Sequence, residues 1–266
     1  MGNAFEVWEG LSMRLGLCGA LLVSGIVRTA SPLPNGKMST APVERGEVEQ
    51  WLKETTAISK ALKMDRINVT AWQDKMEALN RTLSYPKLLK FLNFDQLVQK
   101  IKYPKDIAAA REIHFPQVPG LPAKLFFEPR MFAYRRGATS PTRAHNNMVS
   151  AHLVLKGSFR VRTFQRVRDE ANAIWLRPSM DKEILEGDII TMSDDRDNAH
   201  SFVATSDHAY ILEIPVSQVN LNKRYMLKAD EYSEIYADPS GKPAADGLIR
   251  APVVEFEEAL KRFSGT

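Results

Sequence analysis

The sequence predicts a mainly β fold in which an α-helical segment precedes an antiparallel barrel or sandwich. Between Val43 and about Ile101, apolar residues recur at three- and four-residue spacing, as they do along one face of a helix. After Ala108 this period is replaced by short apolar runs separated by proline and glycine, which is typical of many short strands. The change of period therefore separates a helical extension from a β domain.

The helical extension is expected to contain at least three helices. A first apolar stripe consists of Val48, Trp51, Leu52, Thr55, Ile58 and Leu62, and a second of Trp72, Met76, Leu79 and Leu83. Pro86 can begin a third helix because proline is tolerated in a first turn. Stripes of this kind form packing surfaces, so we expect this segment to support the β domain.

The expected strands are short. They cover residues 111–115, 124–127, 131–134, 151–155, 158–164, 173–176, 188–192, 200–204 and 209–214. Residues 235–249 are expected to add a loop and a strand, and residues 253–263 form a terminal amphipathic helix. The predicted organisation is a signal-like or disordered segment (1–42), a helical extension (43–107), a β-barrel (108–225) and a strand and helix that pack on it (226–266).

Composition argues against several functional classes. The chain has 266 residues and a formal net charge of +4, and its basic residues are interleaved with acidic ones. This pattern favours an ordinary solvated surface over a nucleic-acid interface. The single cysteine, Cys18, excludes an intrachain disulfide framework and a cysteine-based zinc site.

The N-terminal segment has the layout of an export signal. Met13-Arg14 precedes an apolar run over residues 15–27, and small residues follow around Ala30. The run is short for a membrane span. Export through residues 13–30 is therefore one expectation, and a disordered or membrane-associated tail on a cytoplasmic protein is the other.

The β domain carries spacings that resemble the two motifs of the cupin superfamily. Gly137 is followed by five residues and then Arg143-Ala-His145, and Gly157 closes the turn that ends this first region. The second region begins with Gly187-Asp188 and places His200 on the next strand. The resemblance implies a double-stranded β-helix, or cupin barrel.

Strand geometry gives these two histidines a common direction. Because side chains alternate between the faces of a strand, His145 and His200 can both point into a closed barrel. Imidazoles that converge there can bind iron, zinc, nickel or copper. The sequence therefore predicts a divalent metal site in the barrel mouth.

Within the cupins, the chain is most similar to the thiol dioxygenases of the plant cysteine oxidase and cysteamine dioxygenase group. The run from Arg143-Ala-His145 to Leu155-Lys-Gly157-Ser158 has the spacing of that group. Asn198-Ala-His200-Ser-Phe202 and the later run over residues 210–214 look like the group's second region. The resemblance implies Fe(II) held by three histidines and addition of oxygen to a thiol.

This sequence departs from the family at two ligand positions. Arg143 stands where the family has its first histidine, and an arginine cannot ligate a cation. Ser150 stands where other cupins have a glutamate ligand. His152 has the same parity as residue 150 and can supply the third ligand, although it lies about 6–7 Å further along the strand and can instead line the cavity.

Two further side chains are candidates for a part in the chemistry. Glu213 occupies the place of an interior acid in the resembling group, where it would orient a ligating histidine as a hydrogen-bond acceptor. Arg143 would bind the carboxylate of an anionic substrate, because its planar guanidinium matches carboxylates. The alternatives are a surface acid at a strand edge and a solvated loop arginine.

Two functional hypotheses follow. The first is a metal-dependent dioxygenase or other oxidoreductase that acts on a small thiol-like molecule. The second is a non-catalytic cupin that has lost its metal and binds a small ligand or a partner. In either case the expected partners are a small molecule and a second copy of the chain as a homodimer, without nucleic acid.

Overall fold

The computed structural model describes residues 42–99, 101–220, 222–229 and 234–263. Four helices come first: α1 (Pro42–Lys63), α2 (Val69–Asn80), α3 (Tyr85–Phe91) and α4 (Phe94–Val98). The signal-like segment predicted at residues 13–30 lies outside the described residues. None of the described helices has both the length and the apolar character needed to cross a membrane.

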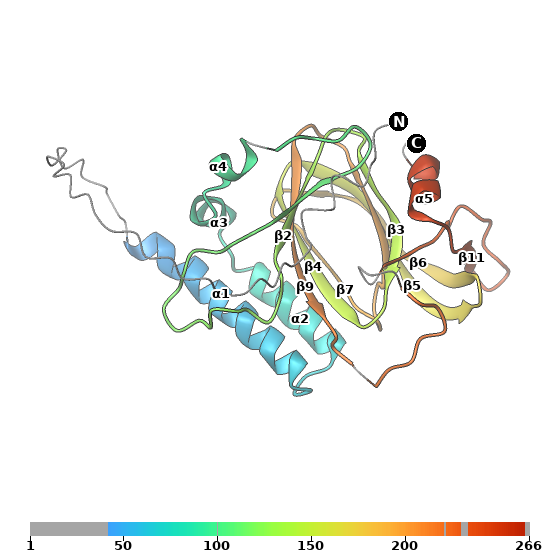
Figure 1. The fold of residues 1–266 in the computed structure, drawn as a ribbon, viewed down its shortest axis with the longest axis horizontal. Helices are drawn as coiled ribbons and strands as arrows, with labels where there is room; N and C mark the ends of the chain where they lie inside the picture. Colours follow the sequence, from blue (N-terminus) through green and yellow to red (C-terminus); the bar gives the residue numbers. More distant parts are fainter. Residues whose placement is uncertain (1–41, 100, 221, 230–233, 264–266) are drawn as a thin grey trace, which may run out of the picture. The chain divides into compact units, whose positions relative to one another are not determined.

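The rest of the chain folds into two antiparallel sheets (Figure 1). The first has the order β1-β2-β9-β4-β7 and the second has the order β10-β3-β8-β5-β6-β11. Their strands are β1 (Ala109–Glu112), β2 (Arg130–Tyr134), β3 (Thr139–His145), β4 (Met148–Lys156), β5 (Ser158–Glu170), β6 (Ala173–Leu185), β7 (Ile189–Met192), β8 (Ala199–Ala204), β9 (Ala209–Ser217), β10 (Glu234–Tyr236) and β11 (Ile249–Pro252).

The helices cover the outer face of the first sheet, as Figure 1 shows for α1 and α2 beside β4, β7 and β9. Trp51, Trp72 and Leu88 of the helices join Leu153 and Leu212 of the strands in one buried apolar cluster. The predicted stripes are therefore packing surface. Burial of these apolar side chains is the main favourable contribution to the association of the helices with the sheet.

Polar contacts fix the position of α2 on the first sheet. Gln73 donates a hydrogen bond from Nε2 to the hydroxyl of Thr191 on β7 at 3.2 Å. Arg196 reaches Asp74 and Glu77 of the helix at 2.6 and 3.1 Å. The loop that precedes β8 is thus attached to the helical extension.

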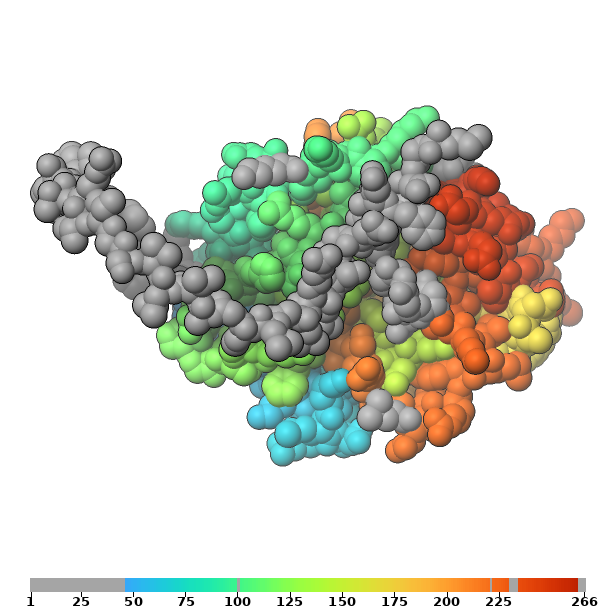
Figure 2. Space-filling model, viewed as in Figure 1, coloured from blue at the N-terminus to red at the C-terminus, as the bar shows by residue number. Residues whose placement is uncertain are grey.

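The outer face of the second sheet is covered by the C-terminal part of the chain. Ile235, Ala237 and Ile249 pack with Ala144 and Leu176 in a separate apolar cluster. Helix α5 (Phe256–Phe263) follows, and Arg262 on it pairs with Asp238. Figure 2 shows this orange-to-red part of the chain beside the yellow strands of the second sheet.

A third cluster fills the interior between the two sheets. Tyr134, Val154 and Ile211 from the first sheet meet Phe159 and Phe202 from the second. With both outer faces and the interior buried, the β domain has the arrangement of a cupin-like barrel. The predicted fold class, a double-stranded β-helix preceded by helices, is confirmed.

Two local predictions differ from the structure. Residues 124–127 do not form a strand, because Pro122 and Pro129 flank them and Phe127 packs under the helices from an irregular segment. Conversely, β3 was not predicted, since its run Thr-Ser-Pro-Thr-Arg-Ala-His is polar and contains Pro141. Its pairing with β8 shifts register between Ser140 and Arg143, where the proline lies.

Gly157 makes the turn between β4 and β5 possible. Its φ is +80°, and a Cβ built there would lie 2.5 Å from Ser206 Oγ and 2.9 Å from Ala209 Cα. Gly137 has the same φ of +80° with nothing within 4 Å of its Cβ position. The two glycines thus separate the cost of the backbone conformation from the cost of a steric clash.

We expect Gly157→Ala to lower the free energy of unfolding by about 3 kcal/mol, combining left-handed strain with overpacking. Gly137→Ala should cost about 1 kcal/mol, because only the strain applies. Urea unfolding of the two variants and the wild type measures both. Equal losses would show that the contact with Ala209 contributes nothing.

Candidate metal centre

Three histidines from the two sheets meet inside the barrel. His145 on β3 and His200 on β8 stack with ring centroids 5.1 Å apart, and His152 on β4 faces His200 at 5.3 Å. None of the three is more than 3% exposed. The structure therefore brings together all three residues that the sequence proposed as metal ligands.

His200 presents a basic nitrogen to the interior. Its Nδ1 lies 3.4 Å from the backbone oxygen of Asn198, so this nitrogen carries the proton and donates a long hydrogen bond. Burial lowers the pKa of His200 well below its ordinary value, and the positive charge of Arg143 lowers it further. The Nε2 atom is buried and has no hydrogen-bond partner within the described residues. It is a neutral lone-pair donor.

His152 is oriented by Glu213, its direct cross-strand partner on β9. Glu213 Oε1 lies 3.3 Å from His152 Nε2, and Ser150 donates to the same oxygen at 3.2 Å. When Nε2 carries the proton that faces the carboxylate, the lone pair of His152 is on Nδ1. Both ring nitrogens of His152 are buried, and neither makes a hydrogen bond of regular geometry to another described residue, although Nε2 lies within ion-pair distance of Glu213.

Glu213 is held as a carboxylate. Burial raises its pKa, but the hydrogen bond with His152 and the charges of His152, Arg143 and Arg130 outweigh burial and bring the pKa to about 2. The carboxylate therefore has the geometry and charge of an acceptor that orients a ligating imidazole.

Arg143 lies in the same interior, directly across from His200 in the β3–β8 pairing. Its Nε is 3.1 Å from Glu234 on β10, and Nη1 donates to Ser140. Burial lowers the pKa of Arg143, but the negative charge of Glu234 outweighs this and raises it. The guanidinium thus has a carboxylate partner from the chain itself.

Asn198 links the two histidines of the second sheet. Its Oδ1 accepts from the backbone N–H of His145 at 3.2 Å, and its Nδ2 donates to the backbone oxygen of His145 at 2.9 Å. Its own backbone oxygen faces His200 Nδ1. Asn198 is not among the site residues predicted from the sequence, although its place two residues before His200 was a usable signal.

The other two histidines lie elsewhere. The His114 side chain is 83% exposed and lies 3.9 Å from Glu112. His208 is in a turn with φ +53° and packs edge-on against Tyr103. Neither contributes to the interior cluster.

The interior suits a divalent cation in its chemistry. It offers imidazole donors, which iron, zinc, nickel and copper accept. Two largely buried carboxylates, Glu213 and Glu234, lie in or beside it. Within the described residues, however, no group of three or more His, Cys, Asp or Glu side chains is arranged to hold an ion as it stands. Binding would require the rings to reorient.

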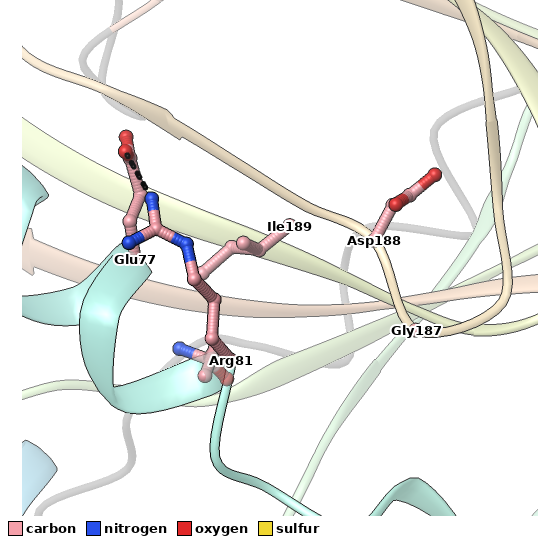
Figure 3. A pocket seen from close by; sticks show the side chains of 6 residues that line it. Glu77, Arg81, Gly187, Asp188 and Ile189 are labelled. Atoms are coloured by element: carbon pink, nitrogen blue, oxygen red, sulfur yellow. Dashed lines mark ion pairs between the residues drawn. The ribbon is translucent and has the colours of Figure 1, made fainter.

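A separate cavity lies between α2 and the turn before β7 (Figure 3). Glu77 of α2 and Arg81, which follows it, face Gly187, Asp188 and Ile189 across it. Its volume is about 230 Å³, and it contains none of the predicted metal ligands or catalytic residues. It is distinct from the barrel interior.

Comparisons with solved structures find partial similarity to several β-barrel proteins. A recombinant oxalate oxidase in complex with glycolate aligns over 43% of this chain and 53% of its own, with 18% identity and a TM-score of 0.32. KdgF from Halomonas sp. aligns over 41% of this chain and 78% of its own, with 13% identity and a TM-score of 0.29. A cupin superfamily protein from Desulfitobacterium hafniense aligns over 44% and 84%, with 10% identity and a TM-score of 0.29.

The chain spans much less of other matched proteins, such as 21% of procruciferin from Brassica napus. No protein-family model matches the sequence, and no curated protein matches it either. With TM-scores this low, the fold class rests on the sheet order and the buried interior. These define a cupin-like barrel protein with a histidine cluster at its centre.

Glu213 should make stability depend on acid pH. Because its folded-state pKa of about 2 is below the ordinary 4.5, the carboxylate stabilises the fold above pH 4.5, and this contribution is lost as pH falls towards 2. We expect the wild type to lose about 2 kcal/mol more than Glu213→Gln between pH 7 and pH 3. Urea unfolding at a series of pH values measures the difference.

The matched control is Glu170→Gln, which removes an exposed carboxylate paired with Arg250. It should change the slope of stability against pH much less than Glu213→Gln does, because the hydrogen bonds from Trp175 and Arg250 lower the pKa of Glu170 but solvent screens these contacts. If Glu213→Gln had the same slope as the wild type, the buried carboxylate would not be ionised.

Asn198→Ala should destabilise the protein by about 3 kcal/mol, since it leaves the backbone N–H and C=O of His145 buried without these partners. Amide hydrogen exchange at His145 should accelerate in the same variant. Asn172→Ala removes an exposed amide that accepts one bond from Arg250 and should change stability little. Unchanged exchange at His145 would contradict the linking role of Asn198.

Proposed function

We propose that the barrel binds a divalent metal ion through His145, His152 and His200 and serves as a metal-dependent oxidoreductase for a small molecule. The observation that carries this proposal is the pair of buried basic nitrogens, His200 Nε2 and His152 Nδ1, that no described residue satisfies. Leaving such atoms buried and unpaired costs free energy, which a bound cation would recover.

The charge of the interior supports the same proposal. Glu213 lies against His152, and Glu234 pairs with Arg143. The Glu213 carboxylate would attract a divalent ion strongly, because little water screens charges in this buried interior.

The chain's own residues would have distinct tasks in such a site. Glu213 holds the proton on His152 Nε2, which directs the lone pair on Nδ1 to the ion. Asn198 holds the backbone of His145 and, through its carbonyl oxygen, the proton on His200 Nδ1. When bound, an ion such as Fe(II) would supply Lewis-acid and redox chemistry. Iron and a thiol substrate are the choices that the resemblance to thiol dioxygenases implies.

A second candidate function is a non-catalytic barrel that has lost its metal and binds a small ligand or a partner. Arg143 favours it, because a buried cation 3.1 Å from Glu234 replaces a ligand and already neutralises one carboxylate.

Metal content distinguishes the two functions. The full chain, incubated with ferrous or zinc ion and desalted, should retain about one equivalent of metal. His145→Ala, His152→Ala and His200→Ala should each lose it, because two imidazoles alone make a weak site. His114→Ala is the matched control, since it removes an exposed histidine. Inductively coupled plasma mass spectrometry measures the metal.

Cobalt substitution provides an independent readout, because visible absorption bands report imidazole coordination directly. If the wild-type protein stayed metal-free after reconstitution, the metal proposal would be wrong. The non-catalytic barrel would then be the supported function. Loss of metal from His114→Ala to the same extent would show non-specific binding. Oxygen uptake with cysteine or cysteamine then tests the substrate class.

A further inference from the structure

A groove of about 410 Å³ lies beside the histidine cluster, formed by β5, the loop before β8 and the segment after β9. We call it the mouth groove. Its lining residues are Arg166, Val167, Arg168, Asp169, Asp194, Asn198, Lys223, Arg224, Tyr225 and Met226. Its volume falls in the range of small-molecule sites.

Two residues that line the mouth groove contact the backbone of His145. Asn198, which holds the backbone of His145, lines the groove. Arg166 also lines it and donates from Nη1 to the backbone oxygen of His145 at 3.1 Å. A ligand in the groove would therefore lie against residues that directly contact His145.

A β-bulge gives the groove its unusual lining. The pairing of β5 with β6 shifts register between Arg166 and Arg168, which leaves Val167 as an extra residue. Residues on both sides of this irregularity, Arg166 to Asp169, line the groove. Bulges bend a strand locally and are frequent beside functional sites.

The groove has an excess of positive charge. Arg166 is paired with Asp169 at 2.7 Å, and Lys223 with Asp194 at 3.4 Å. The remaining two cations, Arg168 and Arg224, make no ion pair within the described part of the chain. Arg168 stacks over the ring of Trp175 at 4.3 Å, which holds its guanidinium in place.

Apolar side chains lie beside these two cations. Val167 is 41% exposed and Met226 is 68% exposed, and they are two of the four large apolar residues exposed in the described structure. Exposed apolar groups gathered in a concave site indicate a ligand that covers them. The charge of Arg168 acts on Glu170, but neither Arg168 nor Arg224 forms an ion pair in the described structure. The groove therefore combines apolar surface with two guanidinium groups that can receive an anion.

From this combination we propose that the mouth groove binds a small organic anion with an apolar part, such as a medium-chain carboxylate. Arg168 and Arg224 would pair with the anionic group, and Val167 and Met226 would contact the apolar part. The groove needs no metal for this binding, so the inference stands apart from the proposed metal centre.

Calorimetric titration of the full chain with octanoate tests the proposal. Octanoate should bind on the order of tenfold more tightly than acetate, because only octanoate covers the apolar residues. The double variant Arg168→Glu with Arg224→Glu should weaken octanoate binding by at least about tenfold. Met226→Gln should weaken octanoate binding and leave acetate binding unchanged.

Arg177→Glu is the matched control, since Arg177 is an exposed arginine on the same β5–β6 pair and outside the groove. It should bind octanoate as the wild type does. Equal weakening by Arg177→Glu and by the groove variants would overturn the proposal, because net charge alone would then explain binding. No detectable heat with octanoate at millimolar concentration would also overturn it.

Two further experiments distinguish octanoate binding from binding to a lipid surface and from binding at the metal centre. Sedimentation with phosphatidylglycerol vesicles distinguishes a lipid surface from a free carboxylate, and vesicle binding without octanoate binding would overturn the proposal. His200→Ala should bind octanoate like the wild type. Octanoate binding that persists in a protein without metal would keep this inference while the metal proposal fails.

Discussion

The pairing of β8 between β3 and β5 is the constraint on which the barrel interior depends. It places His200 opposite Arg143 on one side and Thr163 on the other. Asn198, just before the strand, adds side-chain hydrogen bonds to His145 where β3 ends. Because side chains alternate along each strand, this register decides which groups share the interior. A slip of one residue would turn His200 towards the apolar cluster that covers the outer face.

A polar interior is stable here because both outer faces supply the apolar burial. The helices cover one sheet and the C-terminal segment covers the other, so the apolar cluster inside the barrel is not the only source of hydrophobic stabilisation. Around the histidines, Arg143 pairs with Glu234, and Glu213 lies against His152 and accepts a hydrogen bond from Ser150. Buried charges that lacked such partners would cost several kcal/mol each, roughly, and the fold avoids this cost by cross-strand placement.

The histidine cluster and the mouth groove are neighbouring sites with different chemistry. The cluster presents neutral nitrogens and the buried carboxylate of Glu213, which suits a cation. The groove presents two arginines without ion-pair partners in the described structure and exposed apolar side chains, which suits an organic anion. Asn198 and Arg166 contact His145 from the groove side. Function in this protein therefore depends on sites built onto the barrel, because the fold alone does not specify an activity.

The sequence by itself determined the change from helices to strands near residue 108 and the parity of the histidines, because helical and strand periods are local properties. It could not predict β3, because Pro141 and its polar neighbours lack the apolar pattern of a strand. This strand forms through its pairing with β8. The sequence also could not show that Glu213 lies across from His152, that Glu234 neutralises Arg143, or that a bulge turns Val167 into the groove. Those contacts join residues far apart in the chain, and strand register, which only the tertiary structure decides, brings them together.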